Sequence, residues 1–383
     1  MRLFDVVGTL LLSGGALFSV GCSGSKDKGT TYLPDGAVAG DTGAAGDGGA
    51  TSDSGGPSDG SSPPPSTGIV VTVIPDGTKD GQGLLSAIQG AKVAVHVEMY
   101  LLTNATYLSA LTTLHQAGVD VKVVLNQTFP SGTSASDTNA NSYQELQSAG
   151  VPVSWAPTTT GFDSYTHEKT VIIDPGTAAA QAWIMTMNLD TDAPKYNREY
   201  LAEDTDPADI AEAEAIFEAD YASMSITPTG DLVVAPSPQN NAQQVLLGLI
   251  NGATSSIDVE AEEYDSSGLE EDIAKALESK AGAGITVHMV LETSTDSEQT
   301  SAVSALQAAG GKVVGYAYGG SALDIHAKAI VIDQARAYIG SENLSGGSLG
   351  YNRELGVSFT EASEVMKVYS TIEADFAGGT TYQ

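Results

Sequence analysis

Residues 167–174 read HEKTVIID and residues 326–333 read HAKAIVID, two copies of the pattern H-x-K-x4-D in the two halves of the chain. Side chains alternate between the faces of a strand, so the His and Lys of each copy share one face and the Asp lies on the other. A strand that sets His beside Lys before a run of Val and Ile has no obvious packing motive, because burying an unpaired lysine is costly. The two copies therefore indicate chemistry rather than core packing.

A second shared spacing follows each copy. In the second half GSEN at 340–343 precedes NRE at 352–354, and in the first half MTMN at 185–188 precedes NRE at 197–199. The first Asn and the Glu are eleven residues apart in both halves. The first half departs from the second by having Met-Thr in place of Gly-Ser, and by four extra residues between the Asp and the Asn. We expect these departures to alter the pocket floor and the substrate size more than the activity.

Short apolar runs alternate with helical patterns around both motifs. In the first half we expect strands at 69–74, 92–99, 119–125 and 151–155, and helices at 83–90, 107–117 and 141–149. In the second half we expect strands at 232–234, 256–261, 285–291 and 312–316, and helices at 242–252, 269–281 and 302–310. Strands interleaved with helices predict a mixed, largely parallel α/β sheet, and the repeated order predicts an internal duplication.

The N-terminal residues differ in composition from the rest. An apolar run, 6–20, follows Arg2 and is too short and Gly-rich for a membrane span, so 1–22 is interpreted as a signal peptide. The small residues before Cys22 resemble the lipobox of bacterial lipoproteins, in which the cysteine becomes the lipidated first residue. An ordinary cleaved signal is the alternative. Cys22 is the single cysteine, so no intramolecular disulfide is possible.

The next segment, 23–67, consists almost entirely of Gly, Ser, Asp, Thr, Ala, Lys and Pro and shows no apolar period. Such a segment cannot bury enough surface to fold, so it is predicted to be a disordered tether. The Thr-Pro-Thr-Gly sequence that ends at Gly230 marks the join between the halves. We therefore expect two folded halves, 68–228 and 229–383.

The chain is strongly acidic, with 48 acidic and 16 basic residues and a formal net charge of −32. Residues 1–67 contain seven acidic and three basic residues, which leaves 41 acidic and 13 basic residues and a net charge of −28 for 68–383. Such a surface repels nucleic acid through the sequence-independent electrostatic term, so nucleic acid is not an expected partner. Hydrophobic residues make up 41% of the chain, enough for a packed core.

The doubled pattern resembles the signature of the phospholipase D superfamily, H-x-K-x4-D followed by G-S-x-N, which is usually present twice. The resemblance covers about residues 69–383. It implies an α/β fold of two tandem sandwich repeats, each a mixed sheet flanked by helices, related by a pseudo-twofold axis. The paired motifs would meet in one site at the interface. The implied reaction cleaves a phosphodiester through a phosphohistidine and needs no metal or cofactor.

The resemblance also implies a role for each shared residue. The nucleophile and the acid/base would be His167 and His326, with His167 favoured as the nucleophile. The residues that would bind the phosphate are Lys169, Lys328, Asn188 and Asn343. The carboxylates that would hold the far nitrogen of each His, and so set its tautomer, are Glu199 and Glu354. The residues with an expected structural role, on the other face of each strand, are Asp174 and Asp333.

Other polar residues receive ordinary interpretations. We expect the remaining histidines to be core or surface residues: His96, His115 and His288. We expect Glu98 and Glu260, in corresponding strands of the two halves, to lie at solvated strand ends. The Gly pair at 346–347 is expected to form a tight turn.

Four functions remain open at this point. The first is an exported hydrolase, anchored in the cell envelope or secreted and acting as a monomer, that cleaves phospholipid headgroups to phosphatidic acid and an alcohol. The second is a phosphatidyltransferase similar to cardiolipin synthases, which shares the intermediate. The third is a nuclease of the same superfamily, which the charge opposes. The fourth is a binding lipoprotein with a decayed site, which the intact residues in both halves oppose.

Overall fold

The computed structural model describes residues 66–75, 81–129, 133–135, 138–157, 165–237, 239–266, 268, 270–319 and 323–382. The predicted leader, Cys22 and the tether up to 65 lie outside these residues. Ser66 already contacts the fold, because its backbone N–H donates to the carbonyl oxygen of Ser358 over 2.9 Å. Among the described helices, none is long and apolar enough to cross a membrane.

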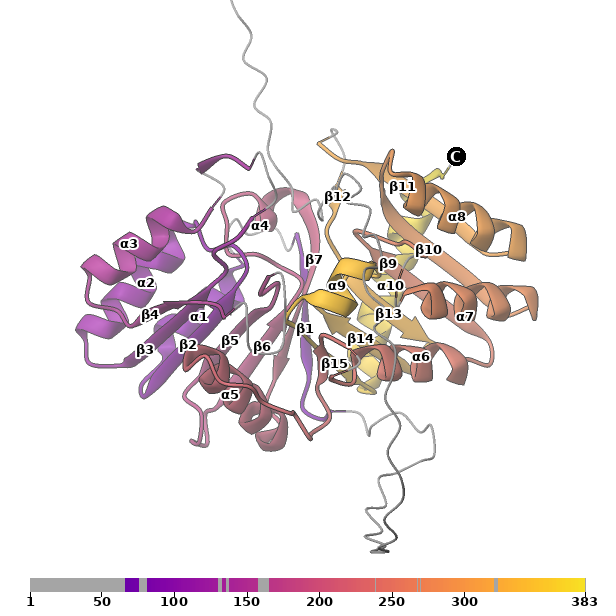
Figure 1. The fold of residues 1–383 in the computed structure, drawn as a ribbon. Coiled ribbons are helices and arrows are strands. Elements are labelled where there is room, and N and C mark those ends of the chain that lie inside the picture. Colours follow the sequence, from indigo (N-terminus) through magenta and orange to yellow (C-terminus); the bar gives the residue numbers. More distant parts are fainter. Residues whose placement is uncertain are drawn as a thin grey trace, which may run out of the picture.

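The first half forms a mixed sheet in the order β1-β7-β6-β5-β2-β3-β4 (Figure 1). Its strands are β1 (Val70–Ile74), β2 (Ala94–Met99), β3 (Asp120–Leu125), β4 (Val153–Trp155), β5 (Lys169–Ile173), β6 (Gln181–Met185) and β7 (Asn197–Asp204). Its helices are α1 (Gln82–Gly90), α2 (Ala105–Gln116), α3 (Ala140–Ser148), α4 (Ala193–Tyr196) and α5 (Pro207–Tyr221).

The second half repeats this order as β8-β15-β14-β13-β9-β10-β11 and adds β16 at the edge. Its strands are β8 (Val233–Ala235), β9 (Ser256–Ala261), β10 (Thr286–Thr293), β11 (Lys312–Ala317), β12 (Asp324–Ile325), β13 (Lys328–Ile332), β14 (Arg336–Gly340), β15 (Glu354–Phe359) and β16 (Thr380–Thr381). Its helices are α6 (Ala242–Gly252), α7 (Glu270–Gly282), α8 (Ser297–Ala309), α9 (Gly346–Tyr351) and α10 (Ala362–Gly378). The mixed α/β fold and the duplication are thus confirmed.

Within each half, parallel pairing joins β2, β3 and β4 in the first sheet and β9, β10 and β11 in the second, and the short β12 of the second half pairs in parallel with β7. The expectation of a largely parallel sheet is therefore wrong. β5 and β6 are joined by the short connection 174–180 and pair antiparallel, and β6 and β7 pair antiparallel as well. A short connection permits only antiparallel neighbours, because a parallel pair needs a longer crossover.

Apolar side chains form three cores. One lies between the first sheet and α1–α3, a second lies between the other sheet and α6–α8, and a third lies between the halves with α5 and α10. Successive side chains of β5 point to opposite faces of the sheet and therefore pack into two different cores. Val171 and Ile173 pack into the core with α1–α3, and Ile172 packs into the core between the halves. Figure 1 shows the halves side by side with the outer helices on opposite flanks.

The motif aspartates lie away from the central interface, at the ends of β5 and β13. Asp174 Oδ1 accepts from the backbone N–H groups of Val93 and Ala94 over 2.6 Å and 3.0 Å. Asp333 Oδ1 accepts from the N–H of Ser255 over 2.7 Å. Burial alone would raise the pKa of Asp333, but hydrogen bonds from Thr254 and its two neighbours outweigh burial and hold that pKa well below its usual range. These contacts tie each motif strand to the start of its neighbour.

Two arginines, Arg353, which is buried, and Arg198, which is half-buried, cross the interface between the halves. Arg353 donates to both carboxylate oxygens of Asp220 on α5, over 2.8 Å and 3.1 Å. Arg198 donates in the same way to Asp375 on α10, over 2.6 Å and 3.1 Å. Each arginine therefore binds the last long helix of the opposite half, as two copies related by a twofold rotation would.

Candidate active site

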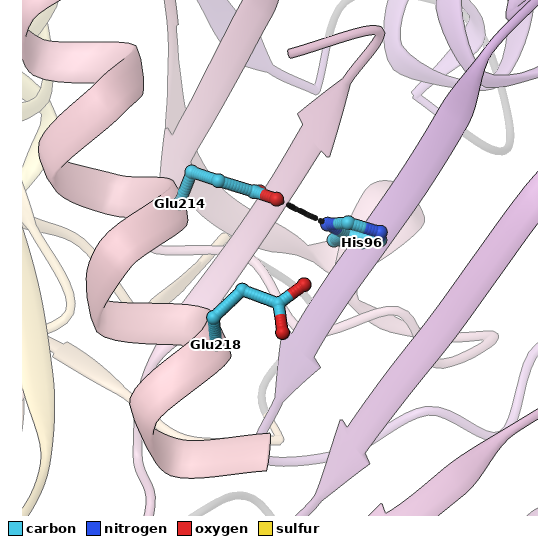
Figure 2. Close-up of side chains that lie close together, drawn as sticks. All are labelled: His96, Glu214 and Glu218. Atoms are coloured by element: carbon cyan, nitrogen blue, oxygen red, sulfur yellow. Dashed lines mark hydrogen bonds and ion pairs between the residues drawn. The ribbon is translucent and has the colours of Figure 1, made fainter. Parts of the chain in front are cut away.

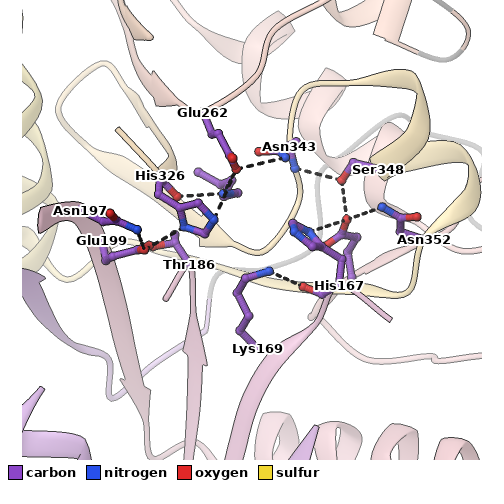
Figure 3. A network of polar contacts seen from close by, with 12 residues as sticks. His167, Lys169, Thr186, Asn197, Glu199, Glu262, His326, Asn343, Ser348 and Asn352 are labelled. Carbon is purple, nitrogen blue, oxygen red and sulfur yellow. Dashed lines mark hydrogen bonds and ion pairs between the residues drawn. The ribbon is translucent and has the colours of Figure 1, made fainter. Parts of the chain in front are cut away.

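The two motif histidines lie in one site between the halves (Figure 3). His167 Nδ1 lies 3.0 Å and 3.1 Å from the two carboxylate oxygens of Glu354. His326 Nδ1 lies 2.8 Å from Glu199 Oε1. Both rings are buried, with 6% and 5% of their surface exposed. Each histidine is thus paired with the glutamate of the opposite half.

The course of the backbone explains why each histidine pairs with the glutamate of the opposite half. β12, which ends one residue before His326, pairs in parallel with the start of β7, so that Asp324 lies opposite Asn197. In the other half the backbone N–H of His167 donates to the carbonyl oxygen of Arg353 over 2.8 Å. The segment before each histidine therefore runs along the opposite half and ends beside the glutamate there.

The motif lysines and asparagines lie in the same region. Each lysine Nζ donates to the carbonyl oxygen of the histidine two residues before it, over 2.7 Å for Lys169 and 2.8 Å for Lys328. Asn188 and Asn343 are buried, each three residues beyond the end of β6 or β14. Ammonium and amide donors at such positions suit an anion held between the two rings.

Hydroxyl and amide groups support both glutamates. Glu354 Oε1 accepts from the Ser348 hydroxyl over 2.6 Å, and Glu199 accepts from the Thr186 hydroxyl. The Asn two residues before each glutamate also donates to it, over 3.3 Å in the second half and 3.2 Å in the first. The first half has Met-Thr where the second has Gly-Ser, and the Thr186 hydroxyl that it retains contacts Glu199.

The expectation of a tight turn at 346–347 is wrong, because these glycines begin α9. That helix carries Ser348, whose hydroxyl also accepts from the backbone N–H of Asn343 over 2.9 Å. Sequence reasoning missed Ser348 because no repeated spacing marks it. In the first half the equivalent hydroxyl comes from Thr186, whereas the matching Ser341 accepts from the N–H of Leu355 instead.

Sequence reasoning also missed Glu262, a buried carboxylate just beyond β9. Its Oε2 accepts from Lys328 Nζ over 2.6 Å and from Asn343 Nδ2 over 3.4 Å. The same oxygen lies 3.4 Å from His326 Nε2. Burial would raise the pKa of Glu262, but Lys328 and His326 outweigh it and keep that pKa low. A carboxylate thus lies beside Nε2 of the second motif histidine.

The first half has Tyr100 at the corresponding place beyond β2. The backbone N–H of Tyr100 donates to Glu168 O, as that of Glu262 donates to Ala327 O. The Tyr100 ring packs edge-on against His167, with ring centroids 4.7 Å apart. The two motifs therefore match in sequence while their surroundings differ.

The two His–Glu pairs also differ in protonation. Burial lowers the pKa of His167 and lowers the pKa of His326 further, with nearby Lys328 adding to the effect on His326. Burial raises the pKa of Glu199 to about 7. For Glu354 the charge and hydrogen bond of His167 outweigh burial, and its pKa is lowered. At neutral pH Glu354 is therefore ionised, whereas Glu199 titrates near neutrality beside a His326 whose own pKa lies well below its usual range.

The expectation that Glu98 and Glu260 are solvated strand ends is wrong. Both side chains are buried, at 1% and 0% exposure. Glu98 accepts from the Thr166 hydroxyl over 2.6 Å, and Glu260 accepts from the Tyr200 hydroxyl. Burial raises the pKa of both carboxyls well above the usual range. They belong to the polar interior of the interface, beside the crossing arginines.

Three groups of described residues could each place ligand atoms within 4.8 Å of one another around a metal ion. Figure 2 shows one of them, His96 with Glu214 and Glu218. His96 Nδ1 hydrogen-bonds Glu214 Oε2 over 2.9 Å, and Lys122 Nζ donates to Glu218. Because the lysine already neutralises Glu218, we interpret this group as an ion-pair network.

The other two groups are Asp258, His288 and Glu373, and Glu98, Glu168 and Asp220. His288 Nδ1 hydrogen-bonds Glu373 over 2.7 Å, which parallels the His96 contact in the other half. In the second group Arg353 already binds both oxygens of Asp220. Glu168 directly follows His167 in the chain, and Glu98 accepts from the Thr166 hydroxyl, so this last group adjoins the first motif.

Comparison with known proteins agrees with this geometry. The family model described as "Cardiolipin synthase, PLD-like domain" matches residues 84–221 and again 246–377, once in each half. The chain therefore belongs to the phospholipase D superfamily. It is an enzyme of the phosphodiesterase and transferase type that this superfamily comprises. A search of curated proteins finds no match.

Solved structures share the fold at low sequence identity. Polyphosphate kinase from Porphyromonas gingivalis matches with a TM-score of 0.61 and 13% identity over 81% of this chain, which spans about half (47%) of the kinase. Phosphatidylserine synthase from Haemophilus influenzae Rd KW20 matches with a TM-score of 0.59 and 11% identity, over 82% of this chain and 87% of that one. Nuc from Salmonella typhimurium, a phospholipase D family member, matches over 40% of this chain and 97% of its own, with 21% identity and a TM-score of 0.36.

The cross-half pairing leads to a prediction about the two glutamates. We expect Glu199→Gln and Glu354→Gln each to lower kcat by about 10²- to 10⁴-fold, because an amide no longer stabilises the imidazole in its required tautomer and charge. The measurement is kcat against pH together with a thermal melt. Both variants should also move the pH profile, which a purely structural role would leave in place.

Glu145→Gln, at an exposed position on α3, is the control. A Glu354→Gln enzyme with the turnover and pH profile of Glu145→Gln would contradict a contribution of this pairing to catalysis.

Proposed function

We propose that this protein is an exported, lipid-anchored hydrolase of the phospholipase D type, which releases the headgroup alcohol of a phospholipid and leaves phosphatidic acid. The observation that carries the proposal is the pair of buried histidines held by glutamates of the opposite halves. A lipid substrate is supported by the family description, which names cardiolipin synthase, and by the phosphatidylserine synthase fold. The predicted lipidation at Cys22 would hold the enzyme at a membrane.

In the first proposed step, His167 Nε2 attacks phosphorus and forms a P–N bond while the P–O bond to the headgroup breaks. His326 donates a proton to the leaving alkoxide, so a neutral alcohol departs. The lysines and asparagines of both motifs hold the non-bridging oxygens and stabilise the charge of the transition state: Lys169, Lys328, Asn188 and Asn343. In the second step His326 takes a proton from water, which attacks phosphorus and breaks the P–N bond.

The protonation of the two pairs supports this division of roles. Ionised Glu354 accepts the Nδ1–H of His167 and leaves Nε2 with a free lone pair, as a nucleophile requires. Glu199, with a pKa raised by burial to about 7, shares an exchangeable proton with His326 near neutral pH. An acid that must later act as a base works best with an apparent pKa near the working pH.

Transfer of the phosphatidyl group to an alcohol uses the same intermediate and is the alternative that the family description favours. Nucleic acid is the weaker substrate, because the net charge of −28 for residues 68–383 repels it. The same acidity disfavours tight docking on anionic bilayers and makes zwitterionic or dispersed lipid the better substrate.

The test is an assay of the full chain on phosphatidylcholine, phosphatidylethanolamine, phosphatidylglycerol and cardiolipin in mixed micelles, and on single-stranded DNA at low salt. Products are identified by mass spectrometry with and without added glycerol. We expect phosphatidic acid as the main product. A glycerol ester in its place would establish a transferase, and cleavage of DNA without cleavage of lipid would contradict the proposal.

A further inference from the structure

The two long helices between the halves, α5 and α10, each pack over a pair of polar side chains on their own sheet. Under α5 the pair is His96 and Lys122, which lie opposite each other on β2 and β3. Under α10 the pair is Asp258 and His288, at the equivalent places on β9 and β10. The same two positions thus hold His and Lys in the first half but Asp and His in the second.

The helices contribute matching side chains to both pairs. Figure 2 shows Glu214 of α5 directed at His96, whose Nδ1 lies 2.9 Å from the carboxylate. Glu373 of α10 lies 2.7 Å from His288 Nδ1 in the same way. An aromatic ring three residues further along each helix stacks on the histidine. The centroids of His288 and Phe376 are 4.1 Å apart with 10° between the ring planes, so this imidazole is held in one orientation.

The two groups differ in how their carboxylates are neutralised. In the first half Lys122 Nζ donates to Glu218 and lies 3.8 Å from Asp120. In the second half neither Asp258 nor Glu373 forms an ion pair with any lysine or arginine among the residues that the structure describes, and His288 is their basic neighbour. Two ionised carboxylates around one imidazole leave an excess of negative charge, which a divalent cation would balance.

Asp258 is the most deeply buried member of this second group. Its side chain is 2% exposed, and its Oδ2 accepts from the Ser256 hydroxyl over 3.2 Å. Its Oδ1 accepts from no N–H or hydroxyl group of the described residues and lies 3.8 Å from His288 Nδ1. Burial and the charge of Glu373 raise the pKa of Asp258 to about 6. Buried polar atoms normally have partners, so Oδ1 indicates a place for a ligand.

The spacing of the donor atoms suits a metal ion. A ring nitrogen and one oxygen from each carboxylate lie within 4.8 Å of one another. Zn²⁺ binds such atoms at about 2.0–2.2 Å in a tetrahedron, which sets neighbouring donors about 3.3–3.6 Å apart. This value lies between the 2.7 Å and 3.8 Å that separate His288 Nδ1 from the two carboxylates. We propose that Asp258, His288 and Glu373 bind a Zn²⁺ ion, with water in the fourth position.

This metal site is separate from the paired histidines. Asp258 lies three residues before Ala261, the end of β9 that is nearer to them, which is about 10 Å along the strand. The ion joins β9 and β10 to α10, two residues before Asp375, which binds Arg198 of the other half. Metal binding at this place stabilises the fold where the halves meet and supplies no group to the reaction.

The test is isothermal titration calorimetry of the untagged full chain in detergent, freed of metal with a chelator, with Zn²⁺ and separately with Ca²⁺. We expect Zn²⁺ to bind at this site and Ca²⁺ to bind weakly, because Ca²⁺ prefers a larger set of oxygen ligands. His288→Lys copies the ion-pair arrangement of the first half, so the variant should fold. It should weaken Zn²⁺ binding by about 100-fold or more, since even a group that only orients a ligand contributes about 10- to 100-fold. Zn²⁺ should raise the melting temperature of the wild type but not that of His288→Lys.

Glu214→Gln, the equivalent of Glu373→Gln in the first half, is the matched control and should keep the wild-type affinity for Zn²⁺. Asp258→Asn has nearly the native shape and should lose binding as His288→Lys does. Binding that survives in both of these variants, binding that is lost in His326→Ala instead, or a wild type that binds no Zn²⁺ would overturn the site. Lipid hydrolysis is not a readout here, so these outcomes leave the proposed function untouched.

Discussion

His167→Ala and His326→Ala are each expected to lower phosphodiester turnover by about ten-thousand-fold or more, and the double variant should be little worse than either single one. The reason is that nucleophile and proton donor act as a unit, so removing one removes the benefit of the other. The measurement is kcat on a cleaved phospholipid, with a thermal melt to show that each variant is folded.

An activated leaving group separates the two roles. A nitrophenyl phosphodiester needs no protonation, so His326→Ala should still form phosphohistidine on this substrate and accumulate it, because no base activates water. His167→Ala should form none. His115→Ala, on α2 outside the site, is the control and should behave as the wild type. Phosphohistidine in the His167→Ala protein would reverse the assignment, and full activity of either variant would end it.

Arg353→Ala is expected to lower the free energy of unfolding by about 3–5 kcal/mol, since it leaves a buried carboxylate without its partner. The side chains of Arg353 and Asp220 are 1% and 0% exposed, and they join the two halves. Denaturant unfolding followed by circular dichroism measures the loss. Activity should fall as well, because Arg353 precedes Glu354 and its carbonyl oxygen accepts from the backbone N–H of His167.

The repeated arrangement supplies a matched control. Arg198 binds Asp375 in the same way, but those side chains are 13% and 12% exposed, so Arg198→Ala should cost less. Adding Asp220→Ala to Arg353→Ala should recover part of the stability, because the uncompensated charge is gone. Equal losses for Arg198→Ala and Arg353→Ala, or no recovery in the double variant, would show that burial of this pair does not determine its contribution.

Local sequence patterns were sufficient to predict the strands and helices that alternate around the motifs. The helix expected at 242–252 and the strand expected at 256–261 form with those bounds. Both elements are specified by their own apolar period. The strand after each motif histidine begins at the lysine, so His167 and His326 lie just outside β5 and β13. The direction in which two strands pair cannot be predicted from the apolar period of either strand. For this reason the sheet is less parallel than expected.

The burial of polar side chains was the property that we predicted least well from the sequence. Glu98 and Glu260 read as solvated strand ends, yet they are almost fully enclosed where the halves meet. Nothing in a strand pattern reveals that a second sheet will cover its polar positions. Ser348 and Glu262 were missed as well. Neither has a residue of the same type at the matching position of the other half, so no repeated spacing marks it.

The sequence by itself determined that the chain contains two copies of one unit and that His, Lys, Asn and Glu recur in each, because repetition is visible without coordinates. Only the tertiary structure decided that His167 pairs with Glu354 and His326 with Glu199, across the halves. It also decided that Glu262 stands at one histidine and Tyr100 at the other. The physical reason is that all of these contacts join residues more than sixty positions apart, and that the two His–Glu contacts arise only when two separately formed sheets meet.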